Sequence, residues 1–150
     1  MTDELKATIE IDAPLEKVWT IVSDLKRMGE WSPMTRKMRV TGPVGVGAKT
    51  FNLNKSGWRV WPTTSKVVRY EPNKQIAFRV NENRTIWSYE LNSDGHTTTV
   101  TERREAPEGT SKVSQFLVQY LMGGTEPFEQ NLTKGMDATL ARIKREAEAA

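Results

Sequence analysis

A long amphipathic segment near the C-terminus, Thr125 to Ala147, most constrains what this chain can fold into. Apolar residues recur through it at steps of four or three positions, which places them on one stripe of an α-helix. They are Phe128, Leu132, Met136, Leu140 and Ile143. At ~1.5 Å per residue the helix is roughly 34 Å long, which exceeds a typical strand. A helix of this length with one apolar stripe requires a broad apolar surface, and we expect the rest of the chain to supply a sheet.

The chain before this helix alternates in the way that strands do. Leu5 to Ile11 predicts a half-buried strand, and Pro14 then opens a helix that continues to Leu25. Met28 to Pro33 predicts a second short helix or a tight turn. Strand-like segments separated by turn residues follow from Met38 to Glu105, which is typical of an antiparallel meander.

Two more segments complete the expected organisation. Helical spacing predicts a helix at 113–121, separated from the long one by Gly123 and Gly124. The strand from Trp58 to Tyr70 is interrupted at Pro62, which indicates a bulge or an edge position. With no internal repeat and no linker, we expect a single domain spanning residues 1–150.

Composition excludes several function classes. The chain has no cysteine, so disulfides, thiolate chemistry and Cys-based metal sites are excluded. The only histidine, His96, falls in a turn, which argues against a His base, a Ser–His–Asp triad or a His-rich metal site. We therefore expect no metal and no cofactor. The first residues show no signal-peptide pattern and no apolar run could span a membrane, so we expect a cytoplasmic protein without membrane insertion.

The net charge of +3 comes from 22 basic and 19 acidic residues that are interspersed. The densest basic stretch is Arg36, Lys37 and Arg39. It is either a patch for an anionic partner or an edge strand with solvated cations. Footprints of nucleic-acid-binding proteins are denser than this, so we expect no nucleic-acid partner. The oligomeric state is not predicted by these features.

The order of elements resembles a known superfamily. A strand, a helix opening at Ile11-Asp12-Ala13-Pro14-Leu15-Glu16-Lys17-Val18-Trp19, the stretch Trp31-Ser32-Pro33, an antiparallel run and a long C-terminal helix are similar to the SRPBCC, or START-like, superfamily. Within it the chain most resembles small bacterial polyketide cyclase/dehydrase-type proteins. The resemblance implies an α+β helix-grip fold, in which a curved seven-stranded antiparallel sheet wraps around the C-terminal helix. It also implies a cavity for an apolar or aromatic small molecule between helix and sheet.

Strand alternation then predicts which residues face that space. Trp87 and Tyr89 share a face of one strand, and Val100 places Glu102 and Arg104 on the same side of the next. Glu102 and Arg104 either form a buried pair that orients a polar ligand group or lie in water at the strand's open end. An unpaired buried Glu102 would have a raised pKa and act as a general acid. Tyr89 is either a hydrogen-bond donor to the ligand or a core tyrosine.

The remaining candidates are apolar or aromatic. Helix residues would form one wall of the site and strand residues the other, with tryptophans stacking on a planar ligand or simply filling the core. The additional candidate ligand-binding residues are Trp31, Phe51, Trp58, Phe78, Phe128, Leu132 and Met136. Because Trp58 and Trp61 are three residues apart, they cannot both face inward on a regular strand.

Three functions are compatible with these residues. The first is binding of a hydrophobic small molecule such as a lipid, a polyketide or a quinone-like compound. The second is a polyketide cyclase/dehydrase (aromatase) enzyme with Tyr89 and Glu102 as the acid/base pair. The third is a ribosome- or chaperone-associated interaction module that uses the basic stretch from Arg36 to Arg39. We favour the first, because the residues needed for hydrolytic catalysis are missing.

Overall fold

The computed structural model describes residues 4–32, 35–56, 58–82, 84–106 and 125–149, with the side chains of 56 and 125–131 excluded. Its strands are β1 (Glu4–Ile11), β2 (Thr35–Val40), β3 (Lys49–Ser56), β4 (Arg59–Glu71), β5 (Gln75–Val80), β6 (Ile86–Ser93) and β7 (Thr98–Glu105). Its helices are α1 (Leu15–Val22), the 3-10 turn η1 (Leu25–Arg27), α2 (Met28–Trp31) and α4 (Thr125–Glu148). The predicted helix at 113–121 lies outside the described residues.

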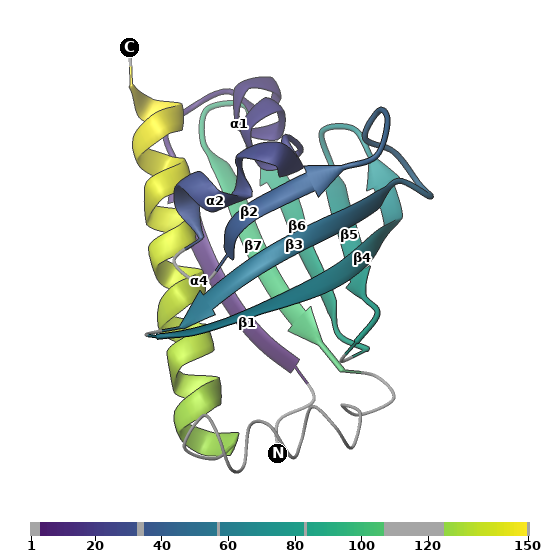
Figure 1. The fold of residues 1–150 in the computed structure, drawn as a ribbon. Helices are drawn as coiled ribbons and strands as arrows, with labels where there is room; N and C mark the ends of the chain where they lie inside the picture. The colour runs from purple at the N-terminus through teal and green to yellow at the C-terminus, as the bar shows by residue number, and fades with distance from the viewer. Residues whose placement is uncertain (1–3, 33–34, 57, 83, 107–124, 150) are drawn as a thin grey trace.

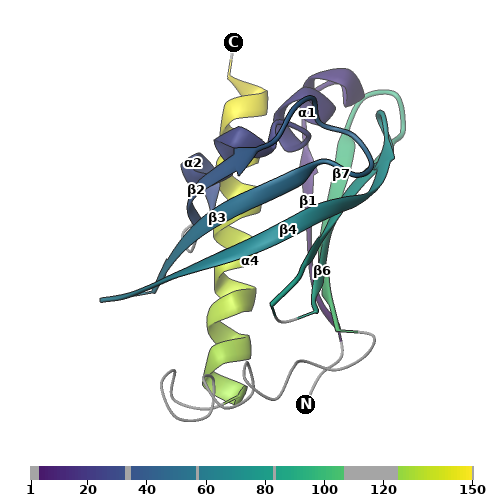
Figure 2. The same ribbon diagram turned by 45° about the vertical axis from the view of Figure 1, so that its right-hand side comes forward.

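All seven strands belong to one antiparallel sheet with the order β1-β7-β6-β5-β4-β3-β2. The sheet curves strongly, so that β2, β3 and β4 cross in front of α4 in Figure 2, while β1 and β7 lie to one side of the helix (Figures 1 and 2). The result is the predicted α+β helix-grip fold. We call the face of the sheet toward α4 the inner face and the opposite face the outer face.

Helix α4 is attached to the sheet through its apolar stripe and through its last turns. Leu140 and Ile143 are fully buried in one core cluster with Ile11 of β1. Two side chains near the helix end reach backbone groups of the β1 region. Lys144 Nζ donates to the Glu10 carbonyl at 2.7 Å, and Glu148 Oε2 accepts from the Asp12 amide at 2.8 Å. The C-terminal half of α4 is therefore held along the β1 edge.

Helices α1 and α2 close the end of the fold between β1 and β2. Pro14 directly precedes α1 instead of being its first residue. In α2, Gly29 approaches the next strand so closely that a Cβ built on it would lie 2.3 Å from the Arg36 carbonyl oxygen. Only glycine permits this contact, since any side chain would collide with the backbone of β2.

Of the two explanations predicted for Pro62, a bulge or an edge position, the structure shows the edge position. Pro62 pairs in regular register with Leu53 of β3, and β4 pairs with β5 only from Ser65 onward. Its missing N–H is therefore tolerated at a position with one neighbouring strand. The register shift of β4 lies further along, between Val67 and Arg69.

Candidate functional site

Tyr89 and Glu102 form a buried polar pair on the inner face. They lie opposite each other on β6 and β7 and are 2% and 3% exposed. Tyr89 Oη donates a hydrogen bond to Glu102 Oε2 at 3.2 Å and lies 3.6 Å from the thioether sulfur of Met28. The other carboxyl oxygen, Oε1, is buried and has no hydrogen-bond partner among the described residues. The described residues therefore leave the hydrogen-bonding capacity of one buried carboxyl oxygen unused.

Burial sets the protonation of this pair. It raises the pKa of Glu102 from 4.5 to about 8, because the charged form loses its hydration. The hydrogen bond from Tyr89 lowers that pKa, and the nearby carboxylate of Asp137 on α4 raises it, but burial dominates. Burial, and then the charge of Glu102, raises the pKa of the Tyr89 hydroxyl. At neutral pH Glu102 is therefore mostly a neutral acid, able to donate a hydrogen bond or a proton.

Arg104 continues the same face of β7. It is 7% exposed and lies opposite Trp87 of β6, which in turn lies opposite Phe78 of β5. Glu102 and Arg104 consequently do not lie in water at an open strand end, and the expected inward orientation holds for both. Phe78 is buried, and Trp87 is partly buried against the core cluster.

Some of the remaining predicted site residues are buried, and others are exposed. Leu132 and Met136 of α4 are buried, and Trp31 is buried at the junction of α2 and α4. The Arg27 guanidinium lies over the Trp31 ring, 4.6 Å from its centroid, and Arg142 Nη1 donates to the Trp31 carbonyl at 3.0 Å. Trp31 therefore joins two helices. The side chain of Phe128 lies outside the described residues.

Phe51 and Trp58 correct the expectation that they line the site. Phe51 of β3 is 52% exposed on the outer face, and Trp58, in the β3–β4 turn, is 82% exposed. Alternation along β4 places Trp61 on the inner face with Thr63, so Trp61 is the inward tryptophan of the two. The structure brings together Tyr89, Glu102 and their neighbours, but not these two aromatic residues.

The inner face of β3 and β4 instead carries a ladder of polar side chains that sequence reasoning missed. Its members are Thr50, Asn52, Asn54, Thr63 and Ser65. Four of them are buried, and Asn54 is partly buried. They bond to one another: Asn52 Nδ2 donates to Thr63 Oγ1 at 3.2 Å, Thr50 Oγ1 to Asn52 Oδ1 at 2.8 Å, and the Thr50 and Ser65 hydroxyls share a short hydrogen bond. The alternation of polar and apolar residues in β3 can be read from the sequence. The rule that apolar residues face the interior, however, assigned the wrong face of this strand to the inside.

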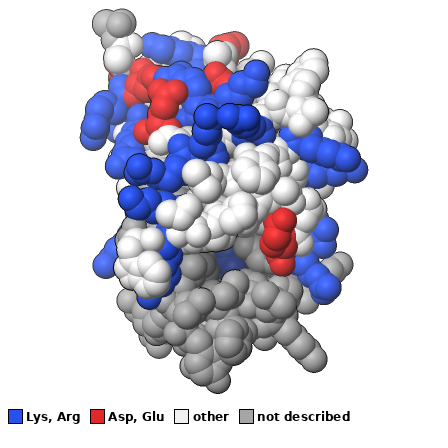
Figure 3. Space-filling model, in the orientation of Figure 1, with Lys and Arg blue, Asp and Glu red and all other residues white. Residues whose placement is uncertain are grey.

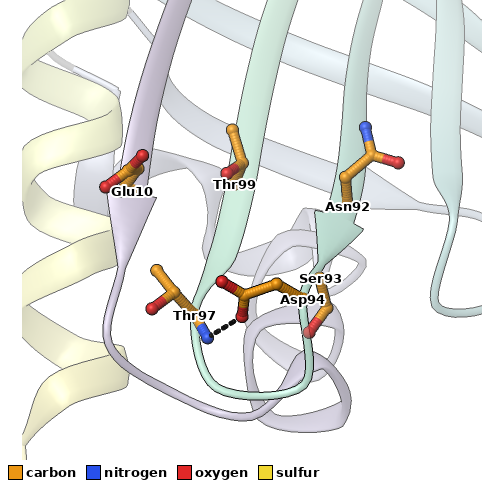
Figure 4. Close-up of a pocket in the computed structure, with 6 residues that line it drawn as sticks. All are labelled: Glu10, Asn92, Ser93, Asp94, Thr97 and Thr99. Carbon is orange, nitrogen blue, oxygen red and sulfur yellow. Dashed lines mark hydrogen bonds between the residues drawn. The ribbon is translucent and has the colours of Figure 1, made fainter.

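A separate pocket of about 280 Å³ lies by the β6–β7 turn, lined by Glu10, Asn92, Ser93, Asp94, Thr97 and Thr99 (Figure 4). Backbone amides of Thr97 and His96 donate to the Asp94 carboxylate and lower its pKa, so this group completes the turn. Within the described part of the chain, no cluster of three or more His, Cys, Asp or Glu residues is arranged to hold a metal. None of the described helices is both long and apolar enough to cross a membrane.

Comparison with known families agrees with this architecture. Residues 2–148 match the family model described as polyketide cyclase / dehydrase and lipid transport. The chain belongs to this family. A family relative of known structure, the Polyketide_cyc-like protein Cgl2372 from Corynebacterium glutamicum, is 30% identical, with a TM-score of 0.63 over 97% of this chain and 91% of that one.

More distant structures share the fold of the family. The Zhui aromatase/cyclase from Streptomyces sp. R1128 is 16% identical, with a TM-score of 0.75 over 97% of this chain and 93% of its own. A START superfamily protein from Mycobacterium smegmatis is 11% identical, with a TM-score of 0.73 over 97% of both chains. The chain spans half of the length of two di-domain ARO/CYC proteins, BexL and StfQ. No curated protein matches it in sequence.

Proposed function

We propose that this member of the polyketide cyclase/dehydrase and lipid transport family binds a hydrophobic or aromatic small molecule between α4 and the inner face of the sheet. The observation that carries the proposal is the Glu102 carboxyl group, which is 3% exposed and has one oxygen without a partner among the described residues. Leaving a buried polar atom unpaired costs about 1–3 kcal/mol. A ligand hydroxyl or carbonyl beside Glu102 would recover this cost.

The surroundings of Glu102 define the ligand chemistry. Met136 of α4 and Phe78 lie in the same buried cluster as Tyr89, Trp87 packs against that cluster, and Arg104 lies two residues along the same strand as Glu102. Because Glu102 is mostly neutral at pH 7, it would donate a hydrogen bond to a carbonyl oxygen. A largely apolar molecule with a carbonyl or hydroxyl group, such as a polyketide, a quinone or a lipid headgroup ester, fits this combination.

Native mass spectrometry of the purified protein tests the proposal first, with denaturation and identification of any released compound. A retained apolar or aromatic molecule with a carbonyl or hydroxyl group supports it. Glu102→Gln keeps a hydrogen-bond donor and should retain most of the affinity, whereas Glu102→Leu should weaken binding roughly tenfold. A clean apo mass, with no thermal shift against polyketide-like, quinone and lipid compounds, would count against binding.

A second candidate function is that of a cyclase/dehydrase enzyme. The observation that favours it is the same pair: Glu102, with a pKa raised to about 8, would supply a proton, and Tyr89 would donate to an enolate oxygen once its hydroxyl turns from Glu102 to the substrate. Glu102→Gln separates the two functions, because it removes the transferable proton but retains the hydrogen-bond donor. Loss of turnover with retained binding would identify an enzyme.

Other predictions from the sequence remain open beside this proposal. The expected cytoplasmic location would be checked by cell fractionation, and the oligomeric state by light scattering. The candidate role of Phe128 in the helix wall would be checked by Phe128→Ala in the same binding assay.

A further inference from the structure

The outer face of β2, β3 and β4 combines exposed apolar side chains with cations. Cross-strand register places Lys37 and Arg39 of β2 directly opposite Leu53 and Phe51 of β3. Lys55 of β3 lies opposite Val60 of β4. We call this area the cationic apolar face: Lys37, Arg39, Lys49, Phe51, Leu53, Lys55, Trp58, Val60, Pro62 and Lys66. Figure 3 shows white side chains over β3 and β4 with Lys and Arg around them.

The apolar residues of this face are unusually exposed for their type. Phe51 is 52%, Val60 56% and Trp58 82% exposed. Phe51 and Leu53 are neighbours on the outer face of β3, and Pro62 lies directly opposite Leu53 with Val60 next to it on the same face of β4. The Arg59 guanidinium lies 5.1 Å from the Trp58 ring centroid, so the most exposed aromatic side chain carries a cation beside it. An apolar group of this kind marks an interaction surface rather than a core.

The charge on this face is one-sided. Lys37, Arg39, Lys49, Lys55 and Lys66 are five cations that share it. An acidic side chain, Glu82, lies beside this face, where its two carboxyl oxygens accept hydrogen bonds from the backbone amide and the hydroxyl of Thr64 at 2.7 Å. The chain as a whole is nearly balanced, at +3. The cations are therefore concentrated around the apolar residues.

From this combination we propose that the cationic apolar face docks on the surface of a membrane that contains anionic lipids. Lys and Arg would meet the lipid phosphates, and Trp58 would sit at the headgroup level, where amphipathic aromatic rings are favoured. Phe51, Leu53 and Val60 would contact the acyl boundary. RNA would also attract the cations, but it offers no apolar layer for the aliphatic side chains. The occupant that matches both halves of the face is a lipid surface.

Sedimentation of the intact protein with vesicles tests the proposal. We expect binding to phosphatidylcholine–phosphatidylserine vesicles at low salt, weaker binding at high salt, and little binding to pure phosphatidylcholine. Lys37→Glu with Arg39→Glu should weaken binding about tenfold or more. Lys6→Glu with Lys134→Glu changes the net charge equally at exposed positions on β1 and α4, and should weaken binding much less.

A second set of variants tests the contribution of the exposed apolar side chains to vesicle binding. Trp58→Ser should reduce vesicle binding severalfold and remove a blue shift of tryptophan fluorescence that vesicles induce. Val46→Ser is the matched control, since Val46 is 70% exposed in the β2–β3 loop, outside the defined face. Equal weakening by both charge pairs, an unchanged affinity after Trp58→Ser, or tight binding to RNA but none to vesicles would each overturn the proposal. Circular dichroism of each variant shows whether it is folded.

Discussion

Tyr89 Oη donates its hydrogen bond to Glu102 Oε2 at 3.2 Å across adjacent strands, while burial raises the pKa of the same carboxyl group to about 8. The tyrosine and the protein interior thus act on Glu102 in opposite directions. The hydrogen bond stabilises the charged form, and the loss of hydration disfavours it more strongly. Both effects change the pKa of Glu102, so each can be tested by measuring how stability and titration respond to pH and to substitution.

The stability of the protein should fall between pH 4.5 and about 8. In this range the folded protein retains the Glu102 proton that the unfolded chain releases, so the unfolded state binds fewer protons. The free energy of unfolding should then decrease by at most about 1.4 kcal/mol per pH unit. Urea titrations at several pH values measure this slope.

Glu102→Gln should remove most of that slope and make the variant more stable than the wild type at pH 8 and above. Glu105→Gln is the control, because Glu105 is half-buried on the outer face of the same strand. If the wild type and Glu102→Gln show the same slope, Glu102 does not titrate in the folded protein as we infer.

Tyr89→Phe should raise the pKa of Glu102 further. The substitution removes the hydrogen bond that lowers this pKa and leaves the burial that raises it. Carbon-13 NMR titration of the Glu102 carboxyl group measures the change. Tyr70→Phe should leave that titration unchanged, since the Tyr70 ring packs edge-on against Trp19, 5.6 Å between centroids. A lower pKa in Tyr89→Phe would contradict the proposed balance.

Gly29→Ala should destabilise the protein by about 1–3 kcal/mol or more, because the added methyl group would collide with the Arg36 carbonyl oxygen. Gly45→Ala provides the matched control: a Cβ there meets no atom within 4 Å. Thermal unfolding of both variants decides the prediction. Equal melting temperatures would mean that α2 and β2 are less closely packed than the structure indicates.

The ion pair between Arg27 and Glu146 should contribute a small coupling energy of about 0.5–1 kcal/mol. It connects the α2 region to α4, and the two side chains are 34% and 39% exposed, so water screens part of the attraction. A double-mutant cycle with alanine measures this coupling. The more exposed pair Lys74–Glu71, 3.5 Å apart, should give a value near zero in the same measurement.

The sequence predicted the strands and the long helix well, because their apolar periods are regular. It also placed Glu102 and Arg104 on the same face as Val100, which could be assigned to the core, but it left open whether the two side chains are buried or lie in water. Alternation reports that two faces differ but not which one is buried. In β3 the polar set is inward, so the rule that apolar residues lie inside assigned Phe51 to the wrong side.

The polar ladder was not predictable for a related reason. Asn52 and Thr63 satisfy each other's hydrogen bonds only after β3 and β4 are paired in their specific register. Such a pair is recognisable once the partner strand is known, whereas each residue alone is typical of a solvated strand. Trp58 directly follows Ser56 and Gly57, which are typical turn residues, so its place in the turn before β4 could have been predicted.

This polar ladder gives the two halves of the sheet different resistance to opening. The half formed by β1, β7, β6 and β5 buries apolar side chains such as Ile11, Val100 and Ile76 against the core. Beside their backbone ladder, β3 and β4 add mainly hydrogen bonds between polar side chains on the inner face, which water replaces at little net cost. Amide hydrogens of that hairpin should therefore exchange with solvent long before those of β6 and β7. A bulky molecule could then enter and leave through transient separation of this hairpin while the rest of the core stays folded.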